Sequence, residues 1–113
     1  MNNQSPQYPL IVSAKDEGYI MVVGSLDEME STLEKIDIEN SEYEAWDSLG
    51  RQTRLSVQDE VNHGHWAEMT IIGHQEDPSL RTRIVSFLSR RGINIDSSLS
   101  IRDLISSLPK GWS

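Results

Sequence analysis

The chain has 113 residues, no cysteine and a formal net charge of −8 at pH 7. This length fits a single domain, residues 1–113, in which we expect the polar residues 1–8 to be flexible. The lack of cysteine excludes disulfide scaffolds, thiol nucleophiles and thiolate metal sites. No apolar run is long enough to cross a bilayer, and so acidic a surface repels nucleic acid and anionic membranes, which leaves a basic partner as the expected one.

The negative charge is concentrated in the first half of the chain. Residues 1–49 contain two lysines and eleven acids, a net charge of −9, whereas residues 50–113 contain eight bases and seven acids, a net charge of +1. The acidic field therefore belongs to the surface that residues 1–49 build.

The first predicted elements are a hairpin and a helix. Residues 10–14 and 19–23 are apolar and β-branched and flank a polar turn, which is typical of two paired strands. Ser25 is a good helix N-cap, and Glu28 completes a capping box. The sequence predicts one helix that ends near Asp37. Its apolar stripe consists of Leu26, Met29, Leu33 and Ile36.

A second hairpin is predicted from residues 43–47 and 51–57. Gly50 accepts a positive φ at no steric cost, as a type I turn with a following bulge requires. In that register the numbers of opposed residues sum to 98, so that Asp47 opposes Arg51. One face is apolar enough to be core, and it carries Tyr43, Ala45, Thr53, Leu55 and Val57.

The other face of this hairpin carries Trp46 beside Glu42 and Glu44, with Glu44 opposite Arg54 in a favourable cross-strand pair. A tryptophan there has two interpretations. It is either an exposed anchor for a partner, or it is covered by another segment such as the N-terminal segment or the C-terminal tail.

The rest of the chain predicts a loop at residues 58–64, a strand at 66–72 and two helices. Asp77 and Pro78 start the first of these helices, Gly92 follows its end, and Ser100 caps the second. Their buried stripes are predicted to be Leu80, Ile84, Phe87 and Leu88, and Ile101, Leu104, Ile105 and Leu108. This order of elements predicts an α+β fold: a mostly antiparallel sheet of four to five strands with about three helices packed on it.

Motifs for catalysis or nucleic-acid binding are weak. His63 and His65 form the histidine cluster, and a zinc site would need a third ligand such as His74 or Glu68. No nucleophile motif, phosphate loop or dinucleotide fingerprint is present. A group of arginines follows Pro78, but the surrounding charge is adverse to nucleic acid. We therefore expect no enzyme, no metal and no cofactor, with a metal-dependent or carboxylate hydrolase that uses His63 and His65 as the alternative.

Residues 43–51, YEAWDSLGR, follow an acidic capped helix and the run IDIEN, and this stretch resembles small bacterial immunity proteins. It is similar in particular to those encoded beside contact-dependent growth-inhibition toxins, over roughly residues 19–58. The resemblance implies a cytoplasmic protein that neutralises a cognate toxin domain, often a basic nuclease, by non-catalytic binding.

We therefore predict a monomer that binds one basic toxin domain through its acids, without nucleic acid or membrane as partners. The predicted contact residues are Asp37, Glu39, Glu42, Glu44, Trp46 and Asp47. A second acidic surface on the first helix consists of Asp27, Glu30 and Glu34. If that helix packs on the apolar face of the second hairpin, the two surfaces lie on opposite sides of the sheet.

Overall fold

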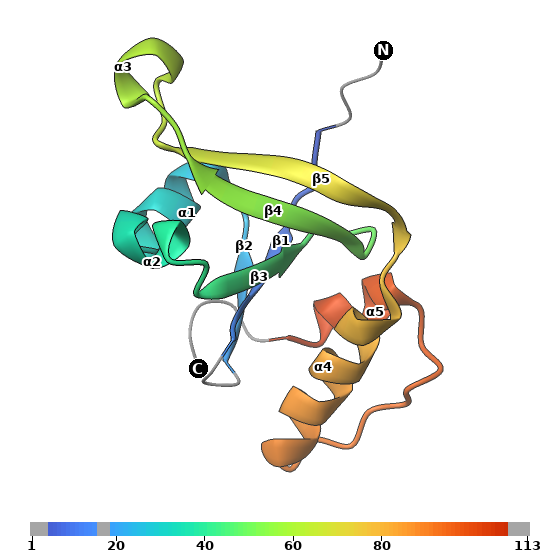
Figure 1. Ribbon diagram of the computed structural model, residues 1–113. Helices are drawn as coiled ribbons and strands as arrows, with labels where there is room; N and C mark the ends of the chain where they lie inside the picture. Colours follow the sequence, from blue (N-terminus) through green and yellow to red (C-terminus); the bar gives the residue numbers. More distant parts are fainter. Residues whose placement is uncertain (1–4, 16–18, 109–113) are drawn as a thin grey trace.

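The computed structural model describes residues 5–15 and 19–108, without the side chain of His63. In this part of the chain five strands form one antiparallel sheet in the order β2-β1-β3-β4-β5, which confirms the predicted α+β class (Figure 1). The strands are β1 (Leu10–Ala14), β2 (Ile20–Val23), β3 (Tyr43–Trp46), β4 (Arg51–Val57) and β5 (Ala67–Glu76). The helices are α1 (Leu26–Thr32), α2 (Lys35–Glu39), α3 (Glu60–His63), α4 (Pro78–Arg90) and α5 (Ile101–Ser106).

Helices cover both faces of the sheet, so the molecule has three layers. Alternate residues of a strand point to opposite faces, and on β1 Leu10, Ile11 and Val12 are all 0% exposed. One core joins Ile11 and Trp46 to the apolar stripes of α4 and α5. The other core lies under α1 and α2. The predicted stripes of α4 and α5 are buried as expected.

The first predicted helix is in fact two short helices. The predicted N-cap is present, because the Ser25 hydroxyl accepts the Glu28 N–H at 3.1 Å. The Glu28 carboxylate accepts the Gly24 N–H at 2.7 Å, one residue before the partner that a standard capping box has. The helix ends early, since Leu33 is extended at φ −101° and ψ 150°. The break changes which isoleucine is buried: Ile38 is 5% exposed, whereas Ile36 of the predicted stripe is 61% exposed.

The predicted register of the second hairpin is confirmed close to its turn only. Ala45 opposes Thr53, and Gly50 takes a φ of +81°. The predicted pairing continues no further: β3 pairs with β1 as far as Tyr43, and β4 pairs with β5 as far as Val57. The two strands diverge, and α2 packs against β4 at the open end.

Two predicted boundaries also differ from the structure. The stretch expected as a loop at residues 58–64 contains the short helix α3, capped by Asp59, whose side chain accepts the Val61 N–H at 2.9 Å. Strand β5 begins one residue later than expected and runs on to Glu76. Gln7, in the segment expected to be flexible, is held by a 2.8 Å hydrogen bond from the Ser48 N–H to its carbonyl. Residues 1–4 lie outside the described part.

Candidate functional site

Trp46 is a core residue. It is 1% exposed, its Nε1–H donates to Asp77 Oδ2 at 2.9 Å, and the Arg83 guanidinium lies 5.4 Å from its ring centroid. The predicted face was correct, but α4 covers that face, so the prediction of an exposed anchor is wrong. Another segment does cover Trp46, but that segment is α4, which is neither the N-terminal segment nor the C-terminal tail named as candidates.

Asp47 is also buried, at 0% exposure. Its carboxylate accepts Arg51 Nη2–H at 2.7 Å and the Gln7 N–H at 3.1 Å. Burial tends to raise the pKa of Asp47, but the hydrogen bonds from Arg51 and Gln7 outweigh it and hold the pKa below its usual range. Asp47 therefore joins the turn, Arg51 and the N-terminal segment, and it is not available as a contact residue.

Of the other four predicted contact residues, two make contacts within the protein and two are exposed. Glu44 is half-buried and pairs with Arg83, in place of the predicted cross-strand pair with Arg54. Asp37 is half-buried and accepts the Tyr43 hydroxyl at 3.4 Å. Glu39 and Glu42 are exposed. Only Glu39 and Glu42 of the predicted set are therefore free of such internal contacts among the described residues.

These two acids join a larger surface, which we call the acidic end. It consists of the exposed side of α1, α2 and the turn after it, and α3 (Figure 1). Its exposed carboxylates are Asp27, Glu28, Glu34, Glu39, Glu42, Asp59 and Glu60. The contacts of Trp66 and His65 hold this end together: Lys35 of α2 lies 5.7 Å from the Trp66 ring, and His65 contacts α1.

Two exposed aliphatic side chains lie on the acidic end. Ile36 is 61% exposed and Val61 is 92% exposed, each with carboxylates as sequence neighbours within three residues. Sequence reasoning missed both. Ile36 was predicted to be buried because its spacing matches the apolar stripe of the first helix. Val61 lies in a stretch that was predicted to be a loop.

A cluster of one histidine and two carboxylates, His65, Glu30 and Asp27, joins α1 to the start of β5. His65 Nδ1 lies 3.1 Å from Glu30 Oε1 and 3.7 Å from Asp27 Oδ1, and Glu30 Oε2 accepts the Ala67 N–H at 3.0 Å. The hydrogen bond with Glu30 raises the pKa of His65, and Asp27 adds to the effect. Burial tends to raise the pKa of Glu30, but the Ala67 and His65 hydrogen bonds lower it overall. Glu30, predicted as free acidic surface, is thus internally paired.

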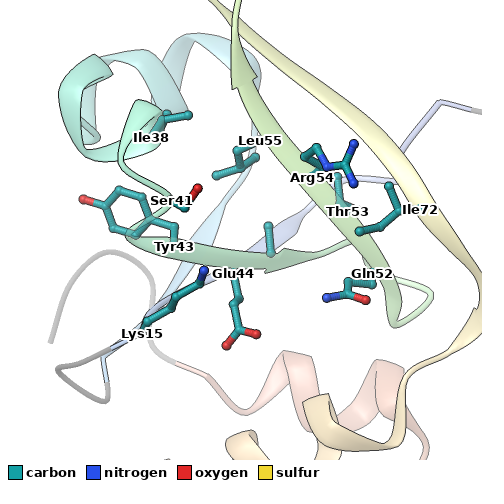
Figure 2. A pocket seen from close by; sticks show the side chains of 11 residues that line it. Lys15, Ile38, Ser41, Tyr43, Glu44, Gln52, Thr53, Arg54, Leu55 and Ile72 are labelled. Carbon is teal, nitrogen blue, oxygen red and sulfur yellow. The ribbon is translucent and has the colours of Figure 1, made fainter.

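A small pocket of about 240 Å³ opens where β3 and β4 diverge (Figure 2). Figure 2 shows Ile38 and Leu55 above the opening and Lys15 and Glu44 below it, with Arg54 on the β4 side. This volume is smaller than the roughly 300–1,000 Å³ of ordinary small-molecule sites. The pocket follows from the divergence of the strands.

Two of the arginines after Pro78, Arg81 and Arg83, are occupied by contacts within the protein, whereas Arg90 and Arg91 are exposed at the end of α4. Arg81 donates to the carbonyls of Ser97 and Leu99 and pairs with Glu76, and Arg83 pairs with Glu44. These contacts join α4 to its neighbours and use charge that nucleic-acid binding would need.

Comparison of the chain with protein-family models, curated sequences and solved structures finds no significant match. Among residues 5–15 and 19–108, no helix is long and apolar enough to cross a membrane.

Proposed function

We propose that this protein is an immunity-type binding module that neutralises a basic protein toxin without catalysis. It acts as a cytoplasmic monomer, one copy to one toxin domain, through the acidic end. The observation that supports this most is the exposure of Ile36 and Val61, 61% and 92%, among exposed carboxylates. The predicted set around Trp46 is thereby replaced by a set centred on α2.

The chemistry of the acidic end suits a basic partner. Carboxylates steer a cationic protein during its approach, and a few apolar anchors surrounded by polar groups supply most of the energy once it is bound. Lys35 contacts Trp66, and the exposed acids of α1 and α2 leave this end strongly negative. A toxin that cleaves nucleic acid has a basic substrate site, which such a surface can cover.

The first test is whether a gene beside this one encodes a toxin domain; such a domain is then the binding partner. The variant Ile36→Ala should weaken binding by roughly tenfold or more, the scale of an interface anchor, mainly through faster dissociation. Leu49→Ala is the matched control, because Leu49 is 53% exposed but lies on the β3–β4 turn. Stopped-flow association and dissociation rates separate the two effects.

Charge is tested by the double variant Glu39→Lys and Glu42→Lys. The double variant should associate with the partner at least about threefold more slowly at low salt. Association of the parent protein should also become slower as the ionic strength rises. Asp103→Lys is the control, since Asp103 is exposed on α5, which packs on the other face of the sheet. Equal effects of the α2 and α5 reversals, or association that does not change with salt, would contradict the proposed surface.

A further inference from the structure

Three side chains of metal-ligating type converge where α1 meets the start of β5. Asp27 and Glu30 are three positions apart, so they project from the same side of α1. His65 comes from the connection before β5 and reaches both. The three donor atoms all lie within 4.8 Å of one another. In the part of the chain that the structure describes, no other such group occurs.

The two distances from His65 to the carboxylates are close to those between the ligands of one ion. Zinc bonds to imidazole nitrogen and carboxylate oxygen are about 2.0–2.1 Å long, which places the ligand atoms of a tetrahedral ion roughly 3.3 Å apart. His65 Nδ1 lies 3.1 Å from Glu30 Oε1 and 3.7 Å from Asp27 Oδ1, on either side of that value. The third separation, between Asp27 and Glu30, is at most 4.8 Å, so the exposed Asp27 side chain would rotate to complete the site.

A hydrogen bond from outside the cluster holds one of the three ligands, Glu30, in place. Glu30 Oε2 accepts the Ala67 N–H at 3.0 Å, which orients the carboxylate and leaves Oε1 for His65. Outer hydrogen bonds of this kind fix metal ligands in known sites. The side chains of Glu30 and His65 are 16% and 36% exposed, whereas that of Asp27 is 88% exposed and can adjust.

We propose that Asp27, Glu30 and His65 bind one divalent cation of the zinc class. An imidazole nitrogen among the ligands favours zinc, cobalt or nickel over magnesium and calcium, which prefer oxygen alone. Two carboxylates and a neutral imidazole balance the charge of the ion. Because the ligands come from α1 and from the start of β5, the ion joins these elements and leaves a coordination position for water or for a group of a bound partner. This inference does not depend on the proposed function.

The competing arrangement is a simple ion pair of His65 with the two carboxylates, and metal titration distinguishes the two. The purified, chelator-treated protein is titrated with zinc in a calorimeter and with cobalt in an absorption spectrometer. We expect one ion per chain, with magnesium unable to displace it. Glu30→Gln, which keeps an oxygen for the Ala67 N–H, and His65→Gln should each weaken zinc binding more than about 100-fold, beyond the 10–100-fold seen for outer-shell changes.

The controls repeat the same changes outside the cluster. Glu34→Gln and His74→Gln alter exposed residues of α1–α2 and β5, and both should bind zinc like the parent. Asp27→Asn changes an exposed side chain and should weaken binding at least about tenfold, so the proposal stays testable if Glu30→Gln does not fold. Absence of one-to-one binding would overturn it. Binding that His63→Gln abolishes and His65→Gln retains would overturn it as well.

Discussion

Replacement of Trp46 by alanine tests the position of α4 over the sheet. Trp46 is 1% exposed and packs within the core formed with α4 and α5. Loss of a buried tryptophan costs about 3–5 kcal/mol through lost burial and the remaining cavity. Asp77 also loses the Nε1–H donor at 2.9 Å, which adds on the order of 1 kcal/mol. The expected loss of about 4–6 kcal/mol is a large fraction of the roughly 5–15 kcal/mol that stabilises a domain.

Trp46→Phe separates the two contributions. It retains an aromatic ring in the core but removes the donor to Asp77, so it should cost about 1–3 kcal/mol. Ile36→Ala is the control on the predicted helical stripe: at 61% exposure it should change the free energy of unfolding by no more than about 0.5 kcal/mol.

Urea denaturation followed by far-ultraviolet circular dichroism measures these differences. Dichroism is preferred because the substitution removes one of the three tryptophans that fluorescence would report. In a thermal melt the alanine variant should lose on the order of 4 °C per kcal/mol. A loss below about 1 kcal/mol for Trp46→Ala would refute the buried placement and would return Trp46 to the candidate interface.

Two further predictions concern the turn between β3 and β4. The pKa values of Asp47 and Asp77 are lowered in the folded state. The stability that these carboxylates contribute is therefore fully present above their pKa in the unfolded chain, about 3.9. It is lost as the pH falls through the lowered pKa values of the folded state. Asp47→Asn should cost about 3–5 kcal/mol at pH 7, because it breaks the ion pair between Asp47 and the buried Arg51. It should also make the decline between pH 5 and pH 2 shallower in urea melts; an unchanged slope would contradict the assignment. Gly50→Ala should destabilise the protein by more than Gly64→Ala: both glycines have positive φ, but a Cβ at Gly50 would lie 2.7 Å from Glu76 Cγ, whereas nothing lies within 4 Å of one at Gly64. Equal unfolding midpoints for the two variants would contradict the close contact of β5 with the turn.

The features that were predictable from the sequence are those decided by neighbouring residues. The Ser25 cap, the positive φ of Gly50 and the buried stripes of α4 and α5 follow from local chemistry and periodicity. The same reasoning placed Trp46 on the correct side of its strand. It could not decide whether that side was solvent or core, because the answer depends on where α4 packs, which is a long-range property.

The division of the first helix shows a different limit. A spacing of three and four residues predicted one stripe through Ile36. The gap between β3 and β4 offers a buried place to Ile38, and α2 turns to fill it. The contact of His65 with Glu30 could not be predicted from the sequence either. The two residues are 35 positions apart, and no local pattern indicates that α1 packs against the start of β5.

The difference in charge between the two halves of the chain is also affected by ion pairs within the folded protein. The second half of the chain has a net charge of +1, but Arg51, Arg81 and Arg83 are occupied by carboxylates or carbonyls within the protein. In the first half, Asp47 and Glu44 are occupied in the same way, while the acids of α1, α2 and the turn after it remain largely exposed. Internal pairing therefore neutralises Arg51, Arg81 and Arg83, while exposed negative charge remains on α1, α2 and the turn after it. Under the proposed function, an approaching basic protein would be drawn toward the acidic end, where the exposed Ile36 and Val61 would supply apolar contacts that charge alone does not.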